Sequence, residues 1–255
     1  MRHFEPVCKP LIIGHRGCRA RFPENTITAF QAAIEAGADM IEFDVRLCAD
    51  GHPVVIHDRT LDRTTTGSGN VADRRLFELK QLDAGSWFHN RFRHETVPTL
   101  EEVLDRFGQN TLMNIEVKVD SDQPRRESAQ IGDKIMLSLT RKNLLSRVII
   151  SSFDKTLLEC IEARGRSPAI GVLTKLGEES DPVFVCRALK AFSYHPNYLE
   201  VDQQLVTMMH SCGIGVVPYT VNDPEDIRRL IRMGVDGLIT DDPETAAGIR
   251  KTGAL

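Results

Sequence analysis

Residues 40–47 have the sequence Met-Ile-Glu-Phe-Asp-Val-Arg-Leu, and this alternation of apolar and charged side chains decides the fold. Side chains alternate between the two faces of a strand, so one face of this segment is apolar and the other is charged. The charged residues are Glu42, Asp44 and Arg46. Residues 111–117 repeat the pattern, with Asn114 and Glu116 on the polar face and Lys118 directly beyond. In a barrel the apolar faces pack on surrounding helices, so we expect the charged faces to point into the barrel mouth.

Short apolar runs alternate with helical patterns along the rest of the chain. Strands are expected at residues 11–14, 40–47, 111–117, 147–151, 169–173, 191–194, 215–221 and 237–239, with an extended segment at 53–57. Helices are expected at residues 25–36, 99–107, 128–142, 155–163, 181–190, 202–211, 225–233 and 244–251. Eight strands, each followed by a helix, in 255 residues predict an α/β fold of the (β/α)8 TIM-barrel type. A doubly wound open sheet is the alternative. The number of strands, eight, favours the barrel, and no G-x-G-x-x-G follows the first strand.

One long segment interrupts this alternation at about residues 59–97. It follows the second strand and is too long for an ordinary connection between a strand and a helix. We therefore expect a small insertion above the active face of a single domain that covers residues 1–255. A lid or specificity element and a surface insertion without a role are equally compatible with the sequence.

Composition and charge exclude several classes of protein. The formal net charge is -4 without a basic stripe, so we expect no nucleic-acid partner. No apolar run approaches the ~20 residues of a membrane-spanning helix, and the first residues do not resemble a signal peptide. We therefore expect a cytoplasmic protein without stable membrane association. Widely spaced cysteines predict reduced thiols rather than a zinc site or disulfides: Cys8, Cys18, Cys48, Cys160, Cys186 and Cys212.

Three carboxylates would meet at the barrel mouth: those of Glu42, Asp44 and Glu116. At a separation of ~5 Å and an effective dielectric constant of ~20, each pair repels by roughly 3 kcal/mol. Protonation, counter-ions such as Lys118 and Arg46, or a divalent cation could offset this repulsion. Carboxylate oxygens alone suit Mg²⁺, Ca²⁺ or Mn²⁺ better than zinc. A purely structural ion-pair network remains the alternative.

Two histidines fall on the same rim. His15 follows the first strand, and His57 ends the extended segment after the second. Each alone would be a packing or surface residue, but together they can supply a general acid and a general base. Arg16 offers a planar fork and Lys118 a point charge for a phosphate group. Neither a P-loop nor a G-x-S-x-G elbow occurs in the sequence.

These residues belong to motifs that resemble the glycerophosphodiester phosphodiesterase family. The run HRGCRARFPENTITAF resembles the family's opening signature, and the later motifs follow in order: IEFDV, VVIHD, NIEVK, SSFD, YTVN and GVDGLITDDP. DAGSWF and YTVN look most like the cytosolic bacterial members. The resemblance covers nearly the whole chain and implies a TIM barrel with a small insertion.

The resemblance also implies the role of each site residue. Glu42, Asp44 and Glu116 would hold the metal, Mg²⁺ or Ca²⁺, and His15 and His57 would be the acid/base pair. Arg16 and Lys118 would contact the phosphate, and Glu24 would complete the site. From its position at the end of the seventh strand, Tyr219 could line the glycerol pocket or merely pack there. The expected reaction converts a small-molecule glycerophosphodiester into sn-glycerol 3-phosphate and an alcohol. A lysophospholipase D and a non-catalytic phosphodiester-binding barrel are the alternatives.

Five further residues are interpreted from their positions alone. Asn222 should face the mouth, and Asp241 is expected to cap the final helix rather than to serve the site. His195 is expected to be structural. Trp87, with the adjoining Phe88, could form a core of the insertion or a wall for the substrate.

Overall fold

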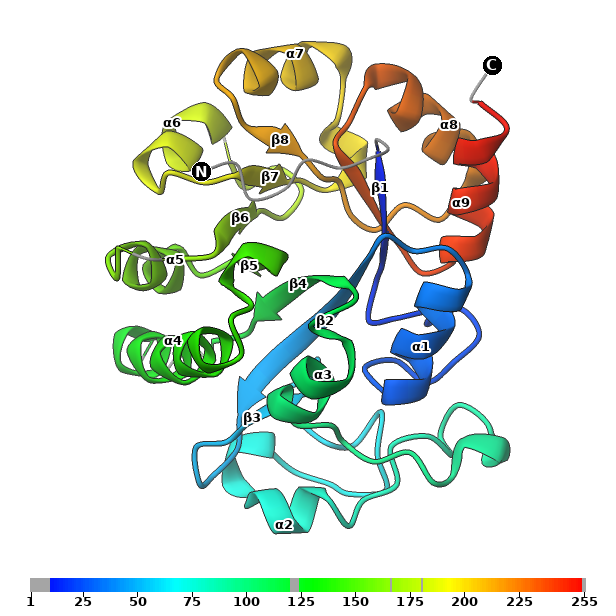
Figure 1. The fold of residues 1–255 in the computed structure, drawn as a ribbon, viewed down its shortest axis with the longest axis vertical. Coiled ribbons are helices and arrows are strands. Elements are labelled where there is room, and N and C mark those ends of the chain that lie inside the picture. Colours follow the sequence, from blue (N-terminus) through cyan, green and yellow to red (C-terminus); the bar gives the residue numbers. More distant parts are fainter. Residues whose placement is uncertain (1–9, 120–123, 166, 180, 254–255) are drawn as a thin grey trace.

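Eight parallel strands form a ring that is surrounded by helices, in this computed structural model (Figure 1). The strands of the ring are β1 (Leu11–Gly14), β2 (Met40–Leu47), β4 (Leu112–Val117), β5 (Val148–Ser152), β6 (Ala169–Leu173), β7 (Ser193–His195), β8 (Gly215–Val216) and β9 (Gly237–Thr240). Their order is β8-β7-β6-β5-β4-β2-β1-β9, and β3 (Pro53–Val55) pairs antiparallel with β2. The structure describes residues 10–119, 124–165, 167–179 and 181–253. Cys8 lies outside these residues.

Backbone hydrogen bonds between the β8 segment and β9 close the ring. The Asp236 amide donates to the Val216 carbonyl at 2.9 Å, and the Ile239 amide donates to the Pro218 carbonyl at 3.0 Å. The Val221 amide returns a bond to the Ile239 carbonyl at 2.8 Å. The expected strand at residues 215–221 is regular only at Gly215–Val216, because Pro218 has no N–H to donate. The predicted TIM barrel is confirmed, and the open doubly wound sheet is excluded because its end strands would not meet.

Helices follow the strands, and all of them except α4 begin after a Thr or Asp whose side chain caps the first turn. They are α1 (Ile27–Glu35), α3 (Leu100–Phe107), α4 (Pro124–Arg141), α5 (Lys155–Glu162), α6 (Pro182–Ala188), α7 (Gln203–Ser211), α8 (Pro224–Met233) and α9 (Pro243–Lys251). At α3, Thr99 and Glu102 exchange the two bonds of a capping box. The helix α1 begins later than expected because Asn25 has a left-handed φ of 60°. Asp242, and not Asp241, caps α9, so the expected role of Asp241 was wrong.

The barrel interior has an apolar layer below a polar one. The apolar layer contains Ile13, Met40, Ile149, Ala169, Val217 and Ile239. Above it, β2 and β4 pair in parallel with Glu42 opposite Asn114 and Asp44 opposite Glu116. The alternation in residues 40–47 therefore directs carboxylates into the barrel and Phe43 into the outer core. The expected structural role of His195 agrees with its complete burial and its bond with Ser193 Oγ.

The segment 59–97 has a small core of its own and lies outside the ring of helices, beside α1 and α3 (Figure 1). It contains α2 (Leu76–Leu79) and two short 3-10 helices, Val71–Asp73 and Asn90–Phe92. Leu61, Val71 and Leu79 pack on Val54 of β3. The Phe92 ring lies 5.5 Å from that of Phe22 in the loop before α1. The insertion is thus attached to the loop that carries His15 and Glu24.

The described part of the chain contains no helix that is both long and apolar enough to cross a bilayer. Its five cysteines are free.

The glycines at positions 17 and 69 predict a difference in folding stability. Both have positive φ, 88° and 81°, but a Cβ at Gly17 would lie 2.6 Å from the Ala29 carbonyl whereas Gly69 faces open space. We expect G69A to lower the free energy of unfolding by about 1–2 kcal/mol, because only φ is strained. G17A should cost about 2–5 kcal/mol, because the overlap adds to the strain. Urea unfolding of both variants tests this, and equal costs would contradict it.

Candidate active site

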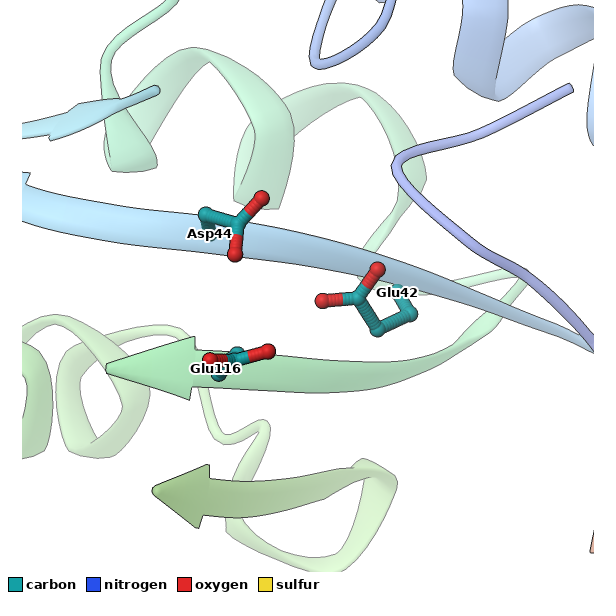
Figure 2. A group of neighbouring side chains, drawn as sticks. All are labelled: Glu42, Asp44 and Glu116. Carbon is teal, nitrogen blue, oxygen red and sulfur yellow. The ribbon is translucent and has the colours of Figure 1, made fainter. Parts of the chain in front are cut away.

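Glu42, Asp44 and Glu116 come together inside the barrel mouth (Figure 2). Each offers an oxygen atom, and these atoms all lie within 4.8 Å of one another. All three side chains are buried. The parallel register of β2 and β4 creates this cluster, because it places Asp44 beside Glu116 with Glu42 on the same face. The expected convergence of these three residues is therefore observed.

Two cations offset the charge of this cluster. Lys118 Nζ lies 3.0 Å from Asp44 Oδ1 and also contacts Glu116, while Arg16 Nε lies 3.2 Å from Asp44 Oδ2. Burial alone would raise the pKa of Asp44, but Lys118 and Arg16 hold it well below its usual range. Burial and the neighbouring carboxylates raise the pKa of Glu42. Burial also raises the pKa of Glu116, and the positive charge of Lys118 opposes this rise only in part. The two cations thus compensate one carboxylate well and leave the cluster short of positive charge.

The cluster has the properties of a site for a hard cation. Glu42 Oε1 is buried and accepts no hydrogen bond from the described residues. An unpaired buried oxygen is costly, and a cation would satisfy it together with its neighbours. Asn25 fixes the orientation of Asp44 by donating from Nδ2 to Oδ2 at 2.8 Å and accepting from the Asp44 amide at 3.2 Å. These residues can therefore hold a divalent metal ion.

The turn after β1 brings Arg16 against the cluster. Arg16 has a left-handed φ of 54°, which directs its backbone N–H to Glu42 Oε2 at 2.8 Å. Its side chain donates from NH1 to Glu24 Oε1 at 2.8 Å. A positive φ in a residue other than glycine is uncommon and is typical of functional turns. Gly17 follows with a φ of 88° and completes the turn.

His15 is held by a carboxylate from the end of β9. Its Nδ1 lies 2.6 Å from Asp241 Oδ1, and Asn222 Nδ2 donates to Asp241 Oδ2 at 2.8 Å. The hydrogen bonds from His15 and Asn222 hold the pKa of Asp241 below its usual value despite burial. An ionised carboxylate can only accept, so His15 Nδ1 carries the proton and Nε2 is left as the basic nitrogen. Burial lowers the pKa of His15, although Asp241 partly opposes this shift.

His57 has a similar arrangement in the segment after β3. Its Nδ1 lies 2.6 Å from Asp58 Oδ1. Arg63 of the insertion donates to the same carboxylate from Nε to Oδ2 at 2.6 Å. Burial lowers the pKa of His57, with Asp44 acting against this. The charges of Asp44 and Arg16 act on both imidazoles, so both lie within electrostatic reach of the cluster.

Tyr219 lies just beyond β8 and contacts residues that follow β5 and β6. Its hydroxyl donates to the Thr174 carbonyl at 2.7 Å, and its ring meets that of Phe153 edge-on at 6.0 Å. Lys118 Nζ lies 5.8 Å from the Phe153 ring. Tyr219 therefore packs beside the site and is linked to it through Phe153.

Comparison of the sequence with models of known protein families identifies the family of this chain. The model described as the glycerophosphoryl diester phosphodiesterase family matches residues 15–245, which include His15, His57 and all three carboxylates. The chain belongs to this family. Membership confirms the expected family and the expectation of an enzyme of the phosphodiesterase class.

Two relatives of the family align over nearly the whole chain. A glycerophosphodiester phosphodiesterase of Caldanaerobacter subterraneus subsp. tengcongensis is 42% identical over 246 residues, which cover 96% of this chain and 99% of that protein. One from Bacillus subtilis is 35% identical over 258 residues, which cover 94% of this chain and 86% of that protein.

A solved structure has the same fold as this chain. A phosphodiesterase of Oleispira antarctica, in complex with the product sn-glycerol 3-phosphate, superimposes with a TM-score of 0.85 at 30% identity and covers 94% and 96% of the two chains.

Sequence reasoning missed several residues of the site. Asn25 and Asp58 directly follow Glu24 and His57, so their proximity in sequence was a usable signal. Arg63 and Asp241 reach the site from the insertion and from β9 through contacts that no local pattern indicates. Arg46, considered as a counter-ion, donates from Nε to the His57 carbonyl at 2.8 Å.

Metal binding is expected to depend on Glu42. In EDTA the E42Q variant should be at least as heat-stable as the wild type, because the amide removes repulsion within the cluster. Adding Mg²⁺ or Ca²⁺ should raise the thermal midpoint of the wild type, since a ligand of the native state stabilises it, but should not raise that of E42Q. E159Q, on the exposed face of α5, is the control and should respond like the wild type. An equal rise in E42Q and the wild type would contradict the assignment.

Proposed function

We propose that this protein hydrolyses glycerophosphodiesters to sn-glycerol 3-phosphate and an alcohol with a divalent cation and two histidines. The observation that carries the proposal is the position of His15 and His57 around the cluster of Glu42, Asp44 and Glu116. Each imidazole is bonded through Nδ1 to a carboxylate, which leaves Nε2 for the substrate. The product bound to the Oleispira antarctica relative supports the same reaction.

The three carboxylates would hold Mg²⁺ or Ca²⁺, because both ions prefer oxygen ligands. When bound, such an ion supplies positive charge to a phosphate oxygen and stabilises the transition state. With the carboxylates compensated, Arg16 and Lys118 are no longer needed as their only counter-ions. Both side chains are then available to bind the phosphate, with Glu24 holding Arg16 by the bond from NH1. Tyr219 would line the pocket for the glycerol portion.

The two histidines would move protons on opposite sides of the phosphorus. One imidazole takes the proton of the nucleophile through Nε2, while the other gives a proton to the oxygen of the leaving alcohol. The nucleophile is either a water molecule or the 2-hydroxyl of the glycerol portion. Attack by the hydroxyl forms a cyclic phosphate, which water then opens to glycerol 3-phosphate. Trapping the cyclic product under slow turnover would distinguish the two routes.

Three broader expectations belong to this proposal. We infer that residues 1–255 form one phosphodiesterase domain with its insertion at about 59–97. The partner is a small-molecule substrate, and the negative net charge argues against nucleic acid. A cytoplasmic location remains a prediction, supported by the free cysteines of the described residues.

Activity should require both histidines and the metal ion. Wild-type protein is expected to release glycerol 3-phosphate from glycerophosphocholine and glycerophosphoethanolamine with Mg²⁺ or Ca²⁺ and to lose this activity in EDTA. H15A and H57A should each lower kcat by about 10²–10⁴-fold, because each removes a proton-transfer group. H210A, in the last turn of α7 and bonded to Asp236 before the start of β9, serves as the matched control. Release by H15A or H57A at the wild-type rate would overturn the proposed mechanism.

Asp241 should affect the rate through His15. In D241N the amide can present its NH₂ to His15 Nδ1, which favours the tautomer with the proton on Nε2. We expect kcat to fall by about 10²–10⁴-fold with little change in KM, as for the loss of a proton-transfer group. Steady-state kinetics on glycerophosphocholine test this, and an unchanged kcat would show that His15 does not need Asp241.

A lysophospholipase D is a second candidate, and exposed leucines favour it. Leu176 and Leu199 are 58% and 62% exposed on the loops after β6 and β7, at the same end of the barrel as the site. These loops are joined by the bond from the Gly177 amide to Glu200 Oε1 at 2.6 Å. Hydrolysis of lysophosphatidylcholine at a higher kcat/KM than glycerophosphocholine would favour this substrate.

A further inference from the structure

Arg63 of the insertion binds two carboxylates of the site at once. It donates from NH1 to Glu24 Oε2 at 2.9 Å and from NH2 to Glu24 Oε1 at 2.7 Å. It also donates from Nε to Asp58 Oδ2 at 2.6 Å and from NH2 to Asp58 Oδ1 at 3.1 Å. Both contacts have the two-bond geometry that fixes a carboxylate in position as well as compensating its charge.

Each of these carboxylates leads to a different part of the site. Glu24 accepts from Arg16 NH1, and Arg16 in turn lies against Asp44. Asp58 binds His57 Nδ1 at 2.6 Å. We propose that Arg63 is a positioning residue that fixes Arg16 through Glu24 and His57 through Asp58. The inference rests on the proposed roles of Arg16 and His57.

The burial of Glu24 explains why Arg63 matters. The Glu24 side chain is only 3% exposed, and burial by itself would raise its pKa. Arg63, followed by Arg16, instead lowers this pKa to about 2. Without Arg63, Glu24 would depend on Arg16 and would draw its guanidinium away from the phosphate site. Arg19 is a weaker substitute, since its NH2 stays 3.6 Å from Glu24 Oε2.

The bonds to Asp58 act on the other half of the site. Asp58 follows His57 directly and is only partly buried, so its side chain could rotate away without a second anchor. The Arg63 guanidinium donates to both carboxylate oxygens of Asp58 and so keeps Asp58 Oδ1 against the His57 imidazole. Trp87, also in the insertion, lies 6.0 Å from the guanidinium of Arg63 and helps to fix it. The insertion therefore contributes directly to the geometry of the acid/base pair.

An exposed arginine could also be a surface ion pair without consequence, since such pairs contribute little. Arg63 is 43% exposed, which makes this alternative worth testing. Arg21 provides a matched control within the same chain. It also joins two carboxylates, Asp242 at 2.7 Å and Glu244, and is 46% exposed, but neither of these carboxylates bonds to a histidine in the described residues.

The test compares R63M with R21M on glycerophosphocholine in the presence of Mg²⁺. We expect R63M to lower kcat/KM by about 10²-fold, through both kcat and KM, because misplacement of the acid/base and phosphate groups reduces reaction efficiency. R21M should retain the wild-type value. R63K should recover only about a tenth of the activity, because an ammonium group cannot donate paired hydrogen bonds to both Glu24 and Asp58. Added guanidinium should restore part of the activity of R63A, which a loss of folding would not allow.

Combined variants show whether Arg63 affects the activity through Glu24 and Asp58 or independently of them. If Arg63 acts through these residues, D58N should reproduce the loss in kcat and E24Q the rise in KM. R63M should then add little to an E24Q/D58N double variant. Additive losses, or an R63M variant as active as R21M, would overturn the inference. H57A is assayed in parallel, since an active H57A would overturn the proposed function itself rather than the role of Arg63.

Discussion

The burial of three carboxylates within 4.8 Å of one another is the constraint on which the rest of the structure depends. Such groups repel each other by roughly 3 kcal/mol per pair at an effective dielectric constant of ~20. They also lose hydration inside the barrel, which adds to the cost. A protein that keeps this arrangement must supply positive charge and must hold each oxygen in place. The surrounding loops do both.

The turn after β1 and the loop before α1 meet most of this requirement. Arg16 gives Glu42 a backbone N–H and Asp44 a guanidinium, while Asn25 fixes Asp44 from the other side. Both residues have left-handed φ values, which turns these groups inward. These two residues with strained backbone are therefore the ones that orient the Glu42 and Asp44 carboxylates. Lys118, one residue beyond β4, completes the compensation, and the unpaired Glu42 Oε1 leaves a place for a cation.

The two histidines are held in different ways. Asp241, which orients His15, accepts a bond from the neutral amide of Asn222 and has the Arg19 guanidinium 3.7 Å away, whereas Asp58, which orients His57, accepts two bonds from the cationic Arg63. A carboxylate that already pairs with a guanidinium has less negative charge to offer an imidazole. The barrel and the insertion thus surround the two proton-transfer groups with unequal charges. This inequality is consistent with different roles for two residues of the same type.

The sequence alone determined the barrel and most of the site. Alternation in residues 40–47 and 111–117 predicted the inward carboxylates, because side-chain direction in a strand follows from a period of two. His15 and His57 were predicted because each follows a strand. Only the tertiary structure showed that Asp241 orients His15 instead of capping a helix, and that Arg63 joins the insertion to Glu24 and Asp58. Such contacts depend on how β1, β9 and the insertion meet in space, which no local pattern of residues specifies.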